Sequence, residues 1–202
     1  MSDLRQAEYP VLPFIVSRWS RRAMLPEPVA NDELMSLFEA ARWAPSSYNC
    51  QPWRFIFAHR GSPQWDTMFG LLDELNRQWC INAGVLMILV SRTRYEYNGK
   101  KDRSCALNAG AAWENLALQG TSMGLAVRGM QDFDYERART EFGIPSLYDV
   151  QMMIAVGRPG NRESLPERLQ GRETPTQRKP VSEIAFENGL PEDYDSAGSM
   201  AD

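Results

Sequence analysis

Two short polar stretches carry the residue types that could bind a ligand. The first runs Ala44-Pro45-Ser46-Ser47-Tyr48-Asn49-Cys50-Gln51-Pro52-Trp53, and we call it the binding loop. It offers two serine hydroxyls and two amides between prolines that restrict the backbone. A helical pattern precedes it and a strand pattern follows it, so the loop lies at the edge of a sheet. Such a loop can hydrogen-bond a flat ligand with a polar edge, although an ordinary turn from helix to strand is the plain alternative.

The second stretch is Arg18-Trp19-Ser20-Arg21-Arg22, in which Arg18, Ser20 and Arg22 alternate. If the helix expected at 14–19 breaks there, two guanidiniums and a hydroxyl can face one anion, whereas on an unbroken helix they diverge. A phosphate group carries about two negative charges and needs such partners. Arg178-Lys179-Pro180 adds positive charge far away in the sequence. Taken alone, either arginine cluster could simply cap a helix or lie in water.

Composition narrows the class of ligand. The chain has 202 residues and a net charge of −4, yet 19 of its 22 basic residues are arginine. An acidic protein with local arginine clusters fits a small anionic ligand better than a nucleic acid, although genome composition also favours arginine in some organisms. No apolar run reaches the roughly 18 residues of a membrane span, and the first ten residues lack a signal-peptide pattern. We therefore expect a cytoplasmic protein that binds neither membrane nor nucleic acid.

Chemistry carried by the protein's own nucleophiles or metal ligands is not indicated. The three cysteines are scattered, and His59 is the single histidine, so we expect no metal site and no catalytic role for His59. Cys50 has neutral neighbours in sequence and is not expected to act as a nucleophile. No Gly-x-Gly-x-x-Gly follows a strand pattern, which argues against a resident nicotinamide cofactor.

The elements that must position these residues alternate irregularly along the chain. Val85 to Val90 is continuously apolar and predicts a strand buried on both faces. Asn31 is the expected N-cap of a helix that ends at Trp43. Helices are predicted at 14–19, 31–43, 62–79, 104–123 and 135–142, and strands at 54–58, 85–90, 125–128 and 152–156. From residue 157 to 186 follows an irregular segment that we call the arm, and residues 187–202 form an acidic tail expected to be disordered. This order predicts an α+β sandwich.

The polar stretches, in their order and spacing, resemble the FMN-dependent nitroreductase family. The resemblance rests on Arg-x-Ser-x-Arg at 18–22, on the binding loop, on Gly157-Arg158-Pro159 and on Arg178-Lys179-Pro180-Val181-Ser182-Glu183-Ile184, and it covers residues 14–186. It implies a three-layer sandwich with a central, mostly antiparallel sheet flanked by helices. It also implies one FMN-binding domain at 1–186 and a homodimer with swapped arms, with the flavin in the interface.

The same resemblance assigns the residues that bind FMN. Arg18, Ser20, Arg22 and Arg178 would hold the phosphate and ribityl end, with Arg22 able to reach the N1/O2 side of the ring. Pro45, Ser46, Ser47 and Asn49 would come from the other subunit. Asn76 matches a position at the pyrimidine edge, and Gly129, Met130, Gln131 and Asp132 match the segment near N5 and O4. Two departures stand out, because many relatives have Glu-Gly or Gly-Gly at Gln131-Asp132 and a lysine at Trp79.

The resemblance further implies an activity in which FMN, and no protein residue, carries the electrons. NAD(P)H would be a transient co-substrate in a ping-pong cycle, and the oxidant would be a nitroaromatic, a quinone or a flavin. Tyr48, Tyr95 and Tyr97, and more weakly Trp113, are candidates for lining the shared slot. Two alternatives remain open: a substrate-specific flavin dehydrogenase of the azoline type, and a flavin-binding sensor without turnover.

Overall fold

A sheet of antiparallel strands forms the centre of the computed structural model, which describes residues 5–191 and 194. Within those residues the strands are β1 (Met24–Leu25), β2 (Trp53–His59), β3 (Val85–Arg92), β4 (Ala126–Met130) and β5 (Tyr148–Pro159). β3 lies between β2 and β5, and β5 also pairs with β4 and β1, every pairing being antiparallel. None of the helices described is long and apolar enough to cross a membrane.

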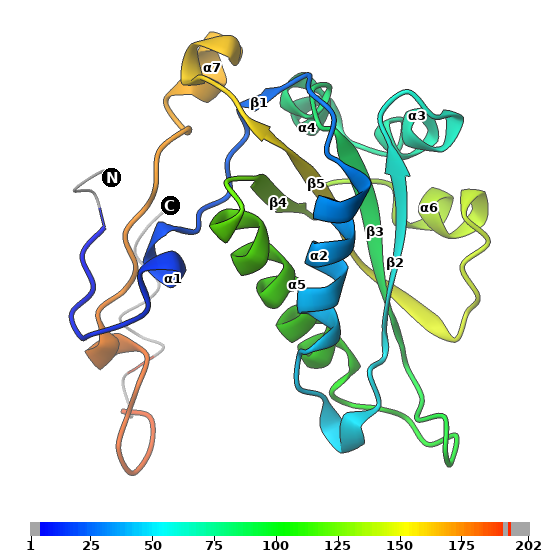
Figure 1. Cartoon of the computed structure of the whole chain (residues 1–202). Coiled ribbons are helices and arrows are strands. Elements are labelled where there is room, and N and C mark those ends of the chain that lie inside the picture. Colours follow the sequence, from blue (N-terminus) through cyan, green and yellow to red (C-terminus); the bar gives the residue numbers. More distant parts are fainter. Residues whose placement is uncertain (1–4, 192–193, 195–202) are drawn as a thin grey trace.

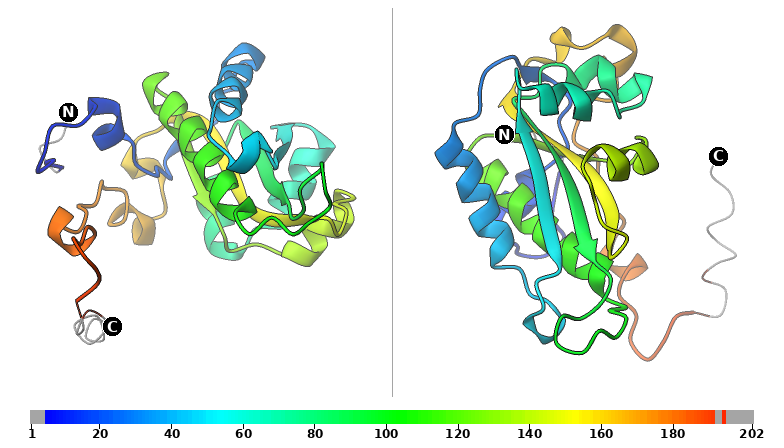
Figure 2. Two further views of the ribbon diagram at one scale, coloured as in Figure 1. Left: turned by 90° about the horizontal axis from the view of Figure 1, so that it is seen from below. Right: turned by 90° about the vertical axis from the view of Figure 1, so that its right-hand side faces the viewer.

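Helices cover both faces of this sheet, as the continuous apolar run of β3 predicts. Val85, Met87 and Leu89 pack with the layer of α2 (Asn31–Arg42) and α5 (Cys105–Ser122). Leu86, Ile88 and Val90 pack with the layer of α3 (Pro63–Phe69), α4 (Glu74–Cys80) and α6 (Tyr135–Glu141). Figure 2 shows the sheet edge-on between these two layers. The predicted three-layer sandwich with a central antiparallel sheet is therefore confirmed.

The start of α2 differs by one residue from the prediction. Ala30, with extended backbone, is the N-cap, and Asn31 is the first helical residue. The cap comes from inside the helix instead, because the carboxylate of Glu33 accepts the Ala30 N–H at 2.9 Å. The same carboxylate pairs with Arg158 at 2.7 Å and so ties the start of α2 to β5. The apolar spacing of Leu34, Leu37 and Ala41 buries the helix on the sheet as expected.

The single helix predicted at 62–79 is wrong, since the chain breaks between Phe69 and Glu74 and forms α3 and α4. The Asp73 side chain accepts the Asn76 N–H at 2.9 Å and starts α4, while the Asp73 N–H donates to the Asp132 carbonyl. Asp73 therefore favours a new helix start over continuation of the old one. The break brings α4 beside the segment that follows β4.

Smaller differences occur elsewhere. Helix α1 spans Pro13–Ser17 and is shorter than the predicted 14–19, β1 was not predicted, and β5 extends well beyond 152–156. The arm contains α7 (Glu167–Gln170) and two 3-10 turns, η2 (Arg162–Ser164) and η3 (Val181–Glu183). The acidic tail expected from residue 187 onward lies largely outside the described residues.

The N-terminal leader (residues 5–12) and the arm run side by side, away from the sheet (Figure 1). Arg5 Nε donates to the Thr176 carbonyl at 2.8 Å, and the Val181 N–H donates to Glu8 at 2.9 Å. Both segments expose large apolar side chains, among them Tyr9, Leu12, Val181 and Ile184. A surface of this kind on a small protein is typical of a contact with another chain.

Candidate functional site

The Arg18–Arg22 stretch is extended, because α1 ends at Ser17. Arg18 is the C-cap residue, with φ −65° and ψ 124°, so the alternating residues that follow are not spread around a helix. Glu173, only 7% exposed, fixes the end of this stretch. Its carboxylate accepts the backbone N–H groups of Arg22 and Ala23, each at 3.0 Å. A buried carboxylate in the arm thus sets the path of a segment about 150 residues earlier in the chain.

This path opens a cavity of about 460 Å³, which we call the arginine pocket. It brings together four residues predicted from the sequence, namely Arg18, Ser20, Arg22 and Arg178. It also contains three arginines that the sequence reasoning missed: Arg5 from the leader, Arg128 from β4 and Arg172 from the arm. A neighbouring cavity of about 580 Å³ shares Arg5, Arg18 and Arg178 and extends between the leader and the arm.

Positive charge dominates the arginine pocket. Two carboxylates lie near these arginines. Glu114 of α5 is 3.5 Å from Arg18 Nε, and Glu173 already accepts the backbone N–H groups of Arg22 and Ala23. Burial lowers the pKa of Arg22, and the nearby Arg172 adds to this while Glu173 opposes it. For Arg128, burial and the charge of Arg22 lower the pKa to about 10. Cations that disfavour one another in this way are stabilised by an anion between them. The pocket is therefore suited to a small ligand with more than one negative charge.

A second group of residues adjoins the arginine pocket through Arg128, whose guanidinium lies 5.3 Å from the centre of the Trp79 ring. Trp79 Nε1 donates to Asn76 Oδ1 at 3.1 Å, and Asn76 Nδ2 donates to the Asp132 carbonyl at 3.4 Å. The predicted pyrimidine-edge residue Asn76 is thus fixed beside the 129–132 segment. Trp79 serves here as a buried support for Asn76.

Gly129 stands on β4 where a larger residue would not fit. A Cβ atom built there would come within 3.3 Å of both the Trp113 and Met152 side chains. Met130 ends the strand as a buried residue, and Gln131 is exposed beyond it. Glycine at this position therefore lets β4 pack against the Trp113 and Met152 side chains without a tight contact.

The binding loop has an unusual backbone. It contains the 3-10 turn η1 (Ser47–Asn49), and three of its residues have positive φ: Tyr48 at 52°, Asn49 at 53° and Gln51 at 43°. Such angles cost energy for residues with a Cβ and concentrate at functional sites. Local hydrogen bonds hold them, because Gln51 N–H donates to Ser46 Oγ at 3.0 Å and Gln51 Nε2 donates to Asn49 Oδ1 at 3.1 Å. Pro45 and Asn49 are exposed.

Behind the loop lies a buried carboxylate that the sequence reasoning missed, Asp102. Its oxygens accept the Ser104 hydroxyl at 2.6 Å and the Ser104 N–H at 2.8 Å. The Ser104 Oγ atom is also 2.8 Å from Ser47 Oγ, and Asn108 Oδ1 accepts the Ser47 N–H at 3.4 Å. Burial alone would raise the pKa of Asp102, but its hydrogen bonds with Ser104, Tyr95 and Cys50 hold it below the usual value. The start of α5 thus positions the loop.

One chain does not bring the binding loop and the arginine pocket together. Ser104, which contacts Ser47, is the N-cap of α5, whereas Glu114, which contacts Arg18, lies ten residues further along. Ten helical residues span about 15 Å. In Figure 1 the loop lies at the far end of α5, away from β1 and α7. The two predicted halves of the site are therefore separate within one chain.

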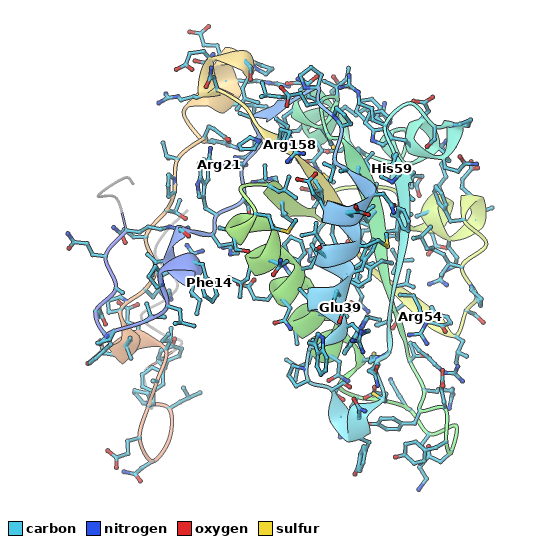
Figure 3. The ribbon with its side chains drawn as sticks, viewed as in Figure 1. Phe14, Arg21, Glu39, Arg54, His59 and Arg158 are labelled. Carbon is cyan, nitrogen blue, oxygen red and sulfur yellow. The ribbon has the colours of Figure 1, made fainter. Side chains whose placement is uncertain are left out.

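The other candidate residues lie outside the arginine pocket. His59 lines a different hollow with Glu27 and Gly84, and Figure 3 shows it on the opposite side of the molecule from Arg21. Burial and the adjacent Asp102 raise the pKa of Cys50, so its thiol is not activated. Tyr48, Tyr95 and Tyr97 form a cluster with ring centres 5.5–6.1 Å apart. Within the described residues no group of three metal-ligating side chains occurs.

The chain is similar to known proteins in sequence and in fold. A curated relative, an uncharacterized 15.4 kDa protein of Mycolicibacterium smegmatis, is 30% identical over 142 residues, which are 66% of this chain and 94% of that protein. The crystal structure of an oxidoreductase containing FMN matches with a TM-score of 0.90 at 36% identity, covering 95% of this chain and 98% of that one.

More distant structures share the fold. A protein of Desulfovibrio desulfuricans solved in complex with FMN has a TM-score of 0.71 at 23% identity, covering 92% of this chain and 100% of that one. A nitroreductase family protein of Streptococcus pneumoniae has a TM-score of 0.69 at 20% identity, covering 87% and 98%. The sequence model of the nitroreductase family matches residues 15–63 and 60–158, well over half of the chain. The chain therefore belongs to the nitroreductase family.

Proposed function

We propose that the protein is an FMN-dependent oxidoreductase that passes hydride from NAD(P)H to a small organic oxidant such as a nitroaromatic, a quinone or a flavin. The arginine pocket carries the proposal, because it gathers six guanidiniums around one cavity with little neutralisation. The family membership and the FMN-containing structure at 36% identity support the same cofactor. The proposal treats residues 1–186 as one FMN-binding domain, working in the cytoplasm, where free thiols such as Cys50, Cys80 and Cys105 persist.

The residues present fit FMN. The phosphate would be held by Arg18, Ser20, Arg22 and Arg178, since a guanidinium binds a phosphate through paired donors. Arg128 also lines this pocket and would add a further guanidinium there. When bound, FMN supplies the hydride acceptor and donor that no side chain of this protein provides.

Residues of the chain would bind and orient the flavin ring and the substrate. Asn76, whose amide is held in place by Trp79 and Asp132, would contact the pyrimidine edge of the ring. Gly129, Met130 and Gln131, which lie at the end of β4 next to Arg128, would face the N5 and O4 side of the ring, as the family resemblance implies. The tyrosine cluster at Tyr48, Tyr95 and Tyr97 offers flat surfaces for an aromatic substrate.

We further propose that the working unit is a homodimer in which the binding loop of one subunit completes the arginine pocket of the other. Three features support it. The two halves are separated along α5 within one chain. The outer face of α5 exposes Leu107 to 76%, with Gly110 and Glu114 at helical spacing on the same face. The leader and the arm add further exposed apolar side chains to this side of the molecule.

The experiment is a spectrum followed by rapid mixing. The purified protein is expected to carry FMN, or to take it up in equal stoichiometry, and to show the visible absorbance of oxidised flavin. NADH or NADPH should bleach this absorbance within the mixing experiment, and menadione or nitrofurazone should restore it. A colourless protein that takes up no FMN contradicts the proposal. Binding of FMN without reduction by either nucleotide instead favours a substrate-specific dehydrogenase or a flavin-binding sensor.

A further inference from the structure

Arg128 stands apart from the other arginines of the pocket. It lies in β4 between buried Val127 and Gly129, and its Nε is buried without a hydrogen-bond partner among the described residues. One terminal nitrogen donates to the Ser20 carbonyl. No carboxylate pairs with it in the part of the chain that the structure describes, although other arginines of the chain, such as Arg158 and Arg18, do have such partners.

Holding a guanidinium in this way is unfavourable for the protein alone. The group has five N–H donors, and a buried donor without an acceptor costs free energy. Burial and the positive charge of Arg22 disfavour the charged form, and the nearby charge of Glu173 offsets them only in part, since the pKa still falls to about 10. The hydrogen bond to Ser20 and the contact with Trp79 engage only part of the guanidinium, so stability of the fold alone does not explain a buried charge at Arg128. An acceptor or a negative charge supplied by a ligand does.

The surroundings of Arg128 indicate which part of the ligand it meets. On one side it bonds to Ser20, between the phosphate residues Arg18 and Arg22. On the other side it covers the ring of Trp79, which holds Asn76 in place. Gly129, the next residue in the strand, begins the segment assigned to the ring. Arg128 thus lies between the residues assigned to the phosphate and those assigned to the ring.

We propose that Arg128 is a further cofactor-binding residue, whose guanidinium faces the polar edge of the flavin ring and favours the reduced flavin. This inference rests on the proposed function. A hydride brings two electrons and one proton, so its uptake adds one negative charge to the bound flavin. A cation at the ring edge therefore stabilises the reduced form more than the oxidised form. Arg18, Ser20, Arg22 and Arg178 then hold the phosphate end, and the contact with the N1/O2 side that the resemblance allowed Arg22 is assigned to Arg128 instead.

The test compares Arg128→Met, Arg128→Gln and Arg128→Lys with the wild type. Arg60→Met is the matched control, because Arg60 is an exposed arginine in the turn after β2 and lines a separate hollow. Dissociation constants for FMN and for riboflavin, which lacks the phosphate, are measured by flavin fluorescence. The midpoint potential of bound FMN is measured by equilibration with a redox dye. Thermal melting identifies any variant that fails to fold, and the Gln variant then replaces the Met variant.

We expect the Met and Gln variants to bind FMN and riboflavin more weakly by similar factors. The preference for reduced over oxidised FMN should fall about tenfold, which is about 30 mV for a two-electron couple. The Lys variant should retain most of the preference, and Arg60→Met should match the wild type. Weakened FMN binding with unchanged riboflavin binding would assign Arg128 to the phosphate and overturn the proposal. Unchanged affinities and potential would reduce Arg128 to a structural partner of Trp79.

Different results would contradict the proposed function and the role of Arg128. If the wild type takes up no FMN, the proposed function falls and the role of Arg128 falls with it. If the wild type binds FMN and the Arg128 variants match it in affinity and in midpoint potential, the proposed function stands and the role of Arg128 is overturned.

Discussion

The arginine pocket and the binding loop are assigned to the same cofactor, but the chain builds them differently. The pocket draws on the leader, the Arg18–Arg22 stretch, β4 and the arm, which are distant in sequence and meet only in the folded protein. The binding loop is ten consecutive residues whose strained backbone is held largely by its own side chains. The pocket is charged and open to a ligand, whereas the loop is neutral and rests on a satisfied carboxylate, Asp102.

This difference indicates which part of the site tolerates change. A locally held loop keeps its shape as long as its few contacts persist. A pocket assembled from remote segments depends on each contact that joins them, and on the second subunit that would bring the loop to it. The contacts between segments are therefore where substitutions should have the largest effect.

Leu107→Asp should separate the two halves of the site. Leu107 is 76% exposed in the single chain, so the substitution should leave the fold intact. At a dimer contact along α5 it would bury a charge, which costs about 3 kcal/mol or more and corresponds to about 100-fold weaker association. The expected results are a monomer by light scattering and at least about 100-fold weaker FMN binding by fluorescence titration.

Ile81→Asp is the control for this change, because Ile81 is 50% exposed and lies after α4 in the other helical layer. It should leave both the mass and the FMN affinity unchanged. A Leu107→Asp protein that is monomeric yet binds FMN like the wild type would show that one chain holds a complete site, and the comparison between pocket and loop would need revision.

Glu173→Ala tests the contact that shapes the pocket. The substitution leaves the N–H groups of Arg22 and Ala23 without their charged acceptor. Hydrogen bonds to charged groups contribute about 1.5–3 kcal/mol each, so the free energy of unfolding should fall by about 3 kcal/mol in urea titrations. FMN affinity should fall as well, because the Arg18–Arg22 stretch is no longer fixed. Glu163→Ala, at an exposed residue of the same arm, is the control and should change neither quantity.

Features that depend on neighbouring residues could be predicted from the sequence, whereas features that depend on contacts between distant residues could not. The long helices near 31–43 and 104–123 and the buried strand near 85–90 follow from apolar spacing alone. The binding loop stands out because its prolines, serines and asparagine act locally. The roles of Glu173 and Asp102 depend on partners brought in by the fold, so their neighbours in sequence give no sign of them. Arg128 did carry a signal, since it is an arginine within an apolar strand pattern.

The helix break at Gly70–Asp73 also depends on a contact between residues distant in the sequence. The apolar spacing at 62–79 continues through the break, so periodicity alone predicted one helix. Asp73 could have served as a cap signal, but a backbone contact with Asp132 from beyond β4 decides the break. Because Asn76 is aimed by this break, the placement of a site residue depended on a feature that the spacing obscured.

Asp102→Asn tests the support beneath the binding loop, with a smaller expected effect than the two changes above. Asparagine keeps one acceptor for Ser104 but loses the charge, and hydrogen bonds to a charged group are the stronger kind. At pH 7 the free energy of unfolding of the apoprotein should fall by about 2 kcal/mol. Asp149→Asn, at an exposed position of β5, is the control and should change it little.

The pH dependence of this difference has a definite sign. Because the folded protein holds the pKa of Asp102 below its ordinary value of 3.8, the stabilisation is complete above that value and is lost as the pH falls through the lower, folded pKa. The wild type should therefore exceed the variant by a constant amount between about pH 5 and pH 7, and the two should converge below pH 3.8. Urea titrations across this range measure the difference. A gap that stayed constant into acid would mean that Asp102 supports the loop through shape and not through its charge.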